Sequence, residues 1–214
     1  MSRTFKTLCY LSTAFLIVYG ACYFYIDLPV TLYAHSHLQN GLIFALSQAI
    51  AIPSLFFFAI GIFLFCSCFA WRFLSKQSNS KLLNLEFTGA SLVLTSFTML
   101  ALKHILGRYR PPMLFSQHLY GFNGPTNAYM QYSSPSGHSG MMFALMISLC
   151  FVIKNTLLRT LFILIAIGFA LARVVVLKHY LGDVIFGAYL AFSICFLLKN
   201  TYYKQLFHQE ANKS

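Results

Sequence analysis

The polar residues of this largely apolar chain gather between Lys103 and Asp183, in three short segments. The segments read Lys-His-Ile-Leu-Gly-Arg-Tyr-Arg-Pro over 103–111, Pro-Ser-Gly-His over 135–138 and Arg-Val-Val-Val-Leu-Lys-His-Tyr-Leu-Gly-Asp over 173–183. Together they supply at least three fixed cations, two histidines and one carboxylate. A phosphoryl group in transfer carries its charge on its equatorial oxygens, which cations neutralise. This set of side chains therefore suggests phosphoryl transfer.

His179 and Asp183 form the first candidate pair. They are four residues apart, so a helix that begins near His179 would place both side chains on one face. A carboxylate that accepts the Nδ1 proton of an imidazole fixes the tautomer and leaves Nε2 free to attack. We therefore expect His179 to be a nucleophile and Asp183 to orient it.

A second histidine, His138, follows Ser136 and Gly137 at the start of an expected helix. Exposed backbone N–H groups and the helix dipole favour an anion at such a position. We expect His138 to donate a proton to a leaving oxygen there. Three cations would neutralise the phosphoryl oxygens, namely Lys103, Arg110 and Arg173.

The composition indicates an integral membrane protein. Of 214 residues, 58% are hydrophobic and 9% are charged, whereas soluble domains carry about 25% charged residues. The length suits a single domain over residues 1–214. The net charge is +11, but the basic residues lie between apolar runs and form no continuous face, so we expect no nucleic-acid partner. The six cysteines lack metal-ligand spacing and no His-Glu-x-x-His motif occurs, so we expect no metal.

A helix needs roughly 20 apolar residues to cross the hydrocarbon layer. Six stretches approach or reach this length, which predicts an all-α polytopic protein with six transmembrane helices in one bundle. The first stretch could instead be a signal peptide or carry a lipoprotein cleavage box, but it lacks a small-x-small site, so we expect an uncleaved span. The fourth is short and begins before its apolar run. The stretches are 8–26, 50–70, 87–106, 139–153, 157–177 and 181–199.

The distribution of Lys and Arg predicts the topology, because short cytoplasmic loops are enriched in them. With both termini inside, six spans place ten of the fifteen cations on the cytoplasmic side. The other five all lie in the two basic segments, which indicates a site on the outer side: Lys103, Arg108, Arg110, Arg173 and Lys178. For Arg108 and Lys178, substrate contact and snorkelling to the headgroups remain equally open. The irregular loop 107–135 lies on the same side, and loops of this length are usually functional.

The three segments closely resemble the signature of the type 2 phosphatidic acid phosphatase superfamily, which reads K-x6-RP, PSGH and SR-x5-H-x3-D. Order and spacing agree, and the six-helix topology of the family's membrane members extends the resemblance over the whole chain. The sequence departs at Ala172, where the family usually has Ser, so one hydroxyl contact to phosphate is lost. The matching positions are Lys103, Arg110, Pro111, Pro135, Ser136, Gly137, His138, Arg173, His179 and Asp183.

The resemblance implies a metal-independent reaction in two steps, without a cofactor. His179 attacks phosphorus while Asp183 orients it, and His138 protonates the departing lipid oxygen. His138 then activates the water that hydrolyses the phosphohistidine. The phosphate is held throughout by Lys103, Arg110, Arg173, Ser136 and the backbone N–H of Gly137.

The expected protein is thus a lipid phosphatase of a bacterial inner membrane, with its active site facing the periplasm. Its substrate would be a phosphomonoester or pyrophosphate of a membrane lipid. Lipid A and undecaprenyl pyrophosphate are favoured, and phosphatidylglycerophosphate and phosphatidic acid stay open. Two alternatives remain, a lipid-to-lipid phosphotransferase and a non-enzymatic lipid-binding or transport protein. The complete set of His138, His179 and Asp183 argues against the latter.

Overall fold

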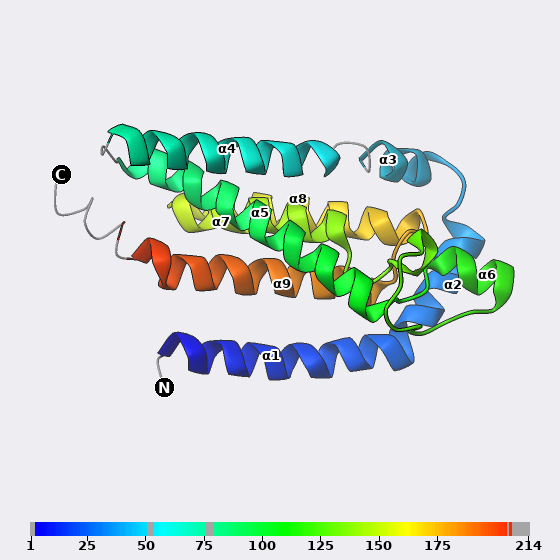
Figure 1. Cartoon of the computed structure of the whole chain (residues 1–214). Coiled ribbons are helices and arrows are strands. Elements are labelled where there is room, and N and C mark those ends of the chain that lie inside the picture. The colour runs from blue at the N-terminus through cyan, green and yellow to red at the C-terminus, as the bar shows by residue number, and fades with distance from the viewer. Residues whose placement is uncertain (1–2, 51–53, 76–78, 205, 207–214) are drawn as a thin grey trace.

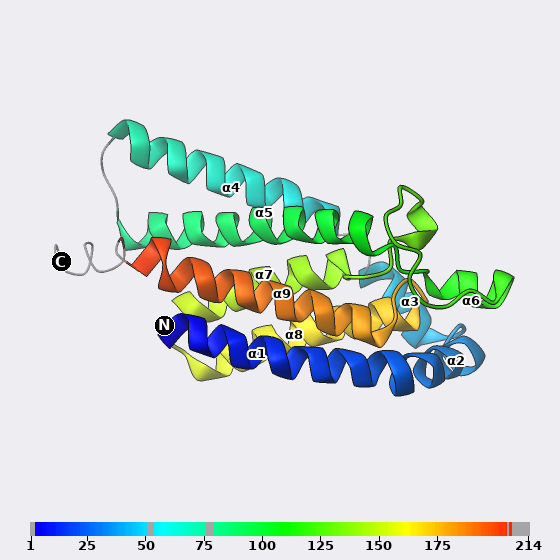
Figure 2. The same cartoon turned by 60° about the horizontal axis from the view of Figure 1, so that its bottom comes forward.

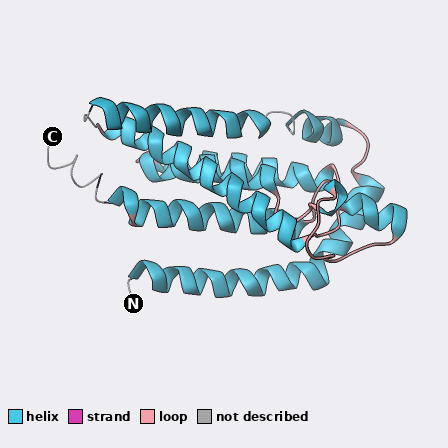
Figure 3. Ribbon diagram, viewed as in Figure 1, coloured by secondary structure: helices cyan, strands magenta, loops and turns pink. Residues whose placement is uncertain are grey.

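The computed structural model describes residues 3–50, 54–75, 79–204 and 206, which form helices and loops and contain no strand (Figure 3). The all-helical prediction is confirmed for these residues. A π-helical turn over Cys22–Ile26 joins the first two helices, and a 3₁₀ turn lies at Tyr129–Gln131. The α-helices are α1 (Arg3–Ala21), α2 (Asp27–His37), α3 (Leu42–Ile50), α4 (Ser54–Ser75), α5 (Ser80–Leu106), α6 (Pro111–Gln117), α7 (Gly137–Val152), α8 (Thr156–Val175) and α9 (Leu181–Asn200).

Five helical segments among the described residues are long and apolar enough to cross a membrane, so the chain is a membrane protein. The first is a continuous run of 34 residues, Thr4–His37, which includes α1, the π-helical turn and α2. The expected fourth span corresponds to α7, which has 16 residues and falls short of that length. Five of the six expected spans are therefore supported by helices of sufficient length, and the sixth stays a prediction.

The long helices lie side by side, with α5, α7 and α9 packed against one another, α4 against α5, and α1 against α9 (Figures 1 and 2). The start of α1 and the end of α9 lie at the same end of the bundle. The loop between α5 and α7 lies at the opposite end, together with α2, α3 and α6. Segments that are far apart in the sequence therefore meet at that second end.

Close contact between α7 and α9 holds the start of α7 in place. A Cβ atom at Gly187 of α9 would lie 2.7 Å from the Ser136 carbonyl oxygen and 3.1 Å from the Gly140 nitrogen. Only glycine allows the two backbones to approach this far. The backbone N–H of Ser136 also donates to the carbonyl oxygen of Asp183 at 2.9 Å. The Ser-Gly-His segment is thus fixed against the first turn of α9.

A second anchor lies at the far end of the bundle, where Glu86 of α5 is fully buried. Arg72 of α4 donates to both of its carboxylate oxygens at 2.9 Å, and the Tyr203 hydroxyl donates at 3.1 Å. A buried charge is tolerated only when it is paired in this way. The pair joins α4 to α5 at a distance from the loop end.

We predict that Gly187→Ala lowers the melting temperature of the protein in detergent by several degrees and reduces its activity. The added Cβ overpacks the α7–α9 contact, which typically costs about 1–3 kcal/mol. The matched control is Gly168→Ala in α8, where a Cβ would meet nothing within 4 Å. The melting temperature of that variant should equal or exceed that of wild type, since alanine is the better helix former. Equal melting temperatures for the two variants would contradict the proposed close contact.

Candidate active site

The loop end of the bundle brings the three polar segments together. Lys103 lies in the last turn of α5 and Arg173 in the last turn of α8. His179 lies in the connection before α9, and its electrostatic environment includes the cations and the other histidine of the expected site. The remaining positions are Arg110 just before α6, Ser136 just before α7, Gly137 and His138 in the first turn of α7, and Asp183 in the first turn of α9.

His179 is buried, with 1% of its surface exposed, and its ring is held by a backbone carbonyl. Its Nδ1 lies 2.7 Å from the carbonyl oxygen of Ser133. Because a carbonyl only accepts, Nδ1 carries the proton and Nε2 keeps its lone pair. The expectation that Asp183 accepts this proton directly is wrong, since its Oδ2 lies 3.9 Å from Nδ1. The physical reason is that α9 begins at Leu181, so His179 stands outside the helix and the four-residue spacing is not helical.

Asp183 instead organises the backbone around His179. Its fully buried carboxylate accepts from the Ser133 hydroxyl, from the Tyr180 backbone N–H at 2.9 Å and from the Arg108 Nη1 at 2.6 Å. It therefore fixes Ser133, whose carbonyl fixes the nucleophile candidate. Its place in the first turn of α9 also suits a negative charge.

Arg108 is the residue whose role the sequence left open, and the structure supports neither substrate contact nor snorkelling. It is fully buried, and it donates to Asp183 and, at 2.7 Å, to Asp27. Its guanidinium lies 4.5 Å from the centre of the Tyr180 ring, a cation–π contact. Burial lowers its pKa, but the two carboxylates more than offset this, so the net pKa is raised.

Asp27 was missed by the sequence analysis. It is fully buried at the start of α2, and it also accepts from the Gly182 N–H at 2.8 Å. A signal was available, because Asp27 is one of two aspartates in the chain and lies within an apolar segment. An ionisable residue in such a segment points to a function and to a buried partner. The preceding π-helical turn is a second signal, since such turns often occur at functional sites.

Backbone carbonyls of the loop 107–135 hold two of the cations. The Lys103 Nζ donates to the Tyr132 carbonyl oxygen at 2.9 Å. The Arg110 Nε donates to the Tyr129 carbonyl oxygen at 3.1 Å, and its guanidinium lies 4.1 Å from the centre of the Tyr129 ring. The Nε of buried Arg173 has no hydrogen-bond partner among the described residues. Donors of these cations thus remain available to an anion.

The electrostatic field of the site is strongly positive. Burial lowers the pKa of His179 well below its ordinary value, and Lys103, Arg110 and Arg173 lower it further. Burial also lowers the pKa of Arg110. The nearby carboxylate of Asp183 offsets this field only in part, because it is paired with Arg108. A neutral imidazole next to uncompensated cations is suited to attack on a bound phosphate.

A cavity of about 290 Å³ adjoins the cations. Lys103, Arg110, Gly137 and His138 line its polar part. The rest of its wall is mainly apolar, with Phe58 of α4, Tyr129, Met141 of α7 and the α5 residues Ser96, Phe97, Met99 and Leu100. Among the described residues, no group of three or more His, Cys, Asp or Glu lies close enough together to hold a metal ion.

These features define a membrane-embedded helical bundle with a cluster of cations and histidines at one end. The family model of the PAP2 superfamily matches residues 87–207, which is more than half of the chain. The chain therefore belongs to the PAP2 superfamily, as its motifs indicate, and membership makes it a membrane phosphatase that acts on phosphoric esters. A search of curated proteins found no match.

The fold is similar to a crystal structure described as the first transmembrane PAP2 type phosphatidylglycerolphosphate phosphatase from Bacillus subtilis. The TM-score is 0.56 and the sequence identity is 19%, over 92% of this chain and 96% of that chain. At this identity the likeness shows the fold alone. Asp27 lies outside the residues that the family model matches.

We predict that Asp27→Asn lowers both stability and turnover. Removing one partner of a buried ion pair costs about 3–5 kcal/mol. Turnover should fall roughly tenfold or more, because a misplacement of about 1 Å in a catalytic group can cost about 10²-fold. Thermal unfolding and phosphate release measure the two effects.

The matched control is Glu86→Gln, which removes the buried partner of Arg72 far from the site. It should destabilise the protein and leave turnover unchanged at temperatures where it is folded. Equal turnover in Asp27→Asn and wild type would show that Asp27 has only a structural role.

We also predict a pH dependence of stability from His179, which lies outside the membrane-spanning segments. Its pKa is lowered in the folded protein, so below about pH 6.5 the unfolded state binds a proton that the folded state does not. The free energy of unfolding should therefore decrease as the pH falls below about 6.5, by up to about 1.4 kcal/mol per pH unit. Between pH 7 and pH 5, in phosphate-free buffer, the melting temperature of His179→Asn should fall by less than that of wild type. Parallel curves would contradict the lowered pKa.

Proposed function

We propose that this protein hydrolyses a phosphomonoester or pyrophosphate of a membrane lipid through a phosphohistidine on His179, without a metal or cofactor. The observation that carries the proposal is the state of His179. Its Nδ1 donates to the Ser133 carbonyl, so Nε2 is unprotonated, and three cations surround the ring. The phosphatase activity follows from family membership, and the mechanism is inferred from the arrangement of these residues.

In the first step, Nε2 of His179 attacks phosphorus and the bond from phosphorus to the lipid oxygen breaks. Lys103, Arg110 and Arg173 neutralise the charge on the equatorial oxygens, with the Ser136 hydroxyl and the Gly137 N–H as further donors. His138 gives its proton to the leaving oxygen. A bound phosphate offsets the positive field of the cations and thereby favours the proton on His138.

In the second step, His138 takes a proton from water, and the resulting hydroxide attacks the phosphohistidine. The bond from phosphorus to Nε2 breaks, and inorganic phosphate leaves. Asp183 is a positioning residue in both steps, since it holds Ser133 rather than the imidazole. Arg108 and Asp27 act in turn through Asp183.

The apolar cavity next to the cations supports a lipid as the substrate. Phe97 and Leu100, which line it, are 57% and 51% exposed, so its wall continues onto the face that meets lipid. A volume of about 290 Å³ suits one hydrocarbon chain beside a headgroup better than several. Undecaprenyl pyrophosphate is thus favoured over lipid A. Phosphatidic acid and phosphatidylglycerophosphate remain candidates, the latter in line with the name of the Bacillus subtilis protein.

We place the protein in a bacterial inner membrane as one domain over 1–214, with α7 as a sixth span and the site facing the periplasm. Its termini would lie in the cytoplasm. The distribution of cations supports this orientation, because the end opposite the site carries the basic residues of the connections. They are Arg3, Arg72, Lys81, Lys154, Arg159, Lys199 and Lys204.

We predict that the purified protein releases phosphate from at least one of these four lipids in the presence of EDTA, and that His179→Ala abolishes release. His118→Asn is the control, since His118 is exposed and asparagine tolerates its positive φ. Release that needs a metal, or that survives in His179→Ala, would overturn the mechanism.

A rapid quench with labelled lipid tests the intermediate. Wild type should carry label on His179 and His179→Ala should carry none, whereas His138→Ala should gain and lose the label more slowly, because His138 serves both steps. Transfer of the label to an added acceptor lipid in place of water would indicate a phosphotransferase. No turnover of any lipid would favour a binding or transport protein.

A further inference from the structure

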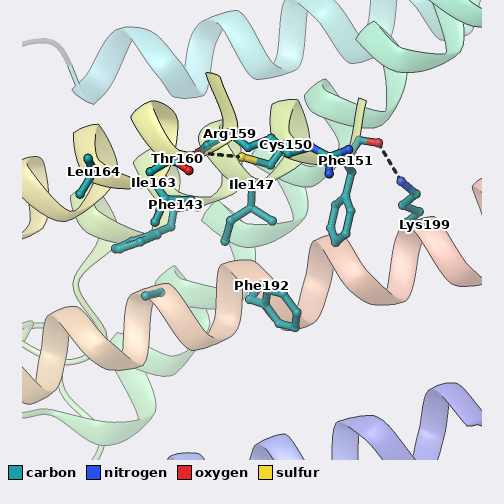
Figure 4. Close-up of a pocket in the computed structure, with 11 residues that line it drawn as sticks. Phe143, Ile147, Cys150, Phe151, Arg159, Thr160, Ile163, Leu164, Phe192 and Lys199 are labelled. Atoms are coloured by element: carbon teal, nitrogen blue, oxygen red, sulfur yellow. Dashed lines mark hydrogen bonds between the residues drawn. The ribbon is translucent and has the colours of Figure 1, made fainter. Parts of the chain in front are cut away.

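A second hollow lies between α7, α8 and α9, away from the active site (Figure 4). Its volume is about 680 Å³, more than twice that of the cavity beside His138. It exists because α7 packs closely along both neighbours, whereas α8 and α9 contact each other only sparsely. The wall is almost entirely apolar and includes Phe143, Ile147, Ile163, Leu164, Ala188 and Phe192.

Two cations, Arg159 and Lys199, line one end of this groove. The Arg159 Nε donates to the Ile153 carbonyl oxygen at 2.6 Å. The Lys199 Nζ donates to the Phe151 carbonyl oxygen at 2.8 Å (Figure 4). Both bonds satisfy free carbonyls at the end of α7, a common role for cations at a helix C-terminus. Each bond uses one donor, so the two Nη nitrogens of Arg159 and two protons of Lys199 stay available.

No carboxylate neutralises these two cations among the described residues. Glu86 pairs with Arg72, and both aspartates of the chain pair with Arg108. Lys154, in the short connection between α7 and α8, is exposed and adds a third positive charge at this end. The groove therefore combines an apolar wall with an uncompensated positive end, which complements an anionic lipid.

The length of the groove fits one leaflet. From Phe143 to Phe151 the rise of α7 is about 12 Å, and half of the hydrocarbon layer is about 15 Å thick. The cations lie near the C-terminal end of α7, whereas His138 lies in its first turn. The two ends of α7 are about 22 Å apart, so a headgroup at Arg159 is out of reach of His179.

We propose that this groove binds one anionic phospholipid of the leaflet opposite the active site. One acyl chain lies along α7 between α8 and α9, and the headgroup phosphate contacts Arg159 and Lys199. The lipid fills the space that α8 and α9 leave open and thereby stabilises the packing of both on α7. This lipid is distinct from the substrate and remains intact.

The test measures lipid retained by the purified full-length protein from nanodiscs of phosphatidylglycerol and phosphatidylcholine in equal amounts, by native mass spectrometry. Wild type should retain one phosphatidylglycerol in roughly tenfold preference, the size expected from hydrogen bonds to a charged group. The double variant Arg159→Gln/Lys199→Gln should lose this preference. Ala188→Phe fills the groove without changing its charge and should lose both lipids.

The matched control is Lys81→Gln/Lys204→Gln, which removes two exposed cations from the same end of the bundle but outside the groove. It should retain the lipid, as should the exchange Arg159→Lys/Lys199→Arg, which preserves the charges. His179→Ala should retain it too, which separates this site from the substrate site. Added phosphatidylglycerol should raise the melting temperature of wild type but not that of the double glutamine variant.

Equal retention of the two lipids by wild type would overturn the proposal, because the groove would then hold acyl chains without regard to charge. An equal loss in the Lys81→Gln/Lys204→Gln control would overturn it as well, since the effect would belong to the basic surface as a whole.

Discussion

The arrangement of the site depends on the burial of one guanidinium between two carboxylates. Removing Arg108 from water is unfavourable unless its charge is matched, and Asp27 and Asp183 match it from two different helices. The three residues thereby fix α2, the start of the loop 107–135 and α9 relative to one another. From Asp183 the constraint passes through the Ser133 hydroxyl to the Ser133 carbonyl and so to His179. The imidazole is thus held by a chain of contacts that begins in the N-terminal helices.

This arrangement separates charges of opposite sign. The carboxylates of Asp27 and Asp183 both pair with Arg108. The cations Lys103, Arg110 and Arg173 instead lie beside the two histidines. The loop holds two of these cations through backbone carbonyls, which are dipoles and leave the net positive charge intact. If a carboxylate held them instead, the attraction for phosphate would be cancelled. The long loop therefore has an electrostatic role as well as a structural one.

Motif spacing was enough to identify the family and the residues at the loop end, because cations and histidines of a phosphate site are conspicuous in an apolar chain. Helix positions followed from hydrophobicity, including the short α7, but the helical run that begins at Thr4 continues to His37, beyond the expected end at residue 26. Two contacts lay beyond sequence reasoning. The acceptor for His179 is a backbone carbonyl, which no residue type signals. The pairing of Arg108 with Asp27 joins residues 81 positions apart, and only the folded bundle brings them together.

The carbonyl contact to His179 has a consequence for how this site tolerates change. Every residue has a carbonyl, so replacing the side chain at position 133 leaves the direct holder of the imidazole chemically intact. An alanine scan would register Asp183 and Arg108 strongly, and would register position 133 only through its hydroxyl. Side-chain substitutions therefore test the carbonyl contact to His179 less directly than they test the contacts of Asp183 and Arg108. The residues that position 133 tolerates are limited mainly by the backbone path that places its carbonyl next to His179, and less by the identity of the side chain.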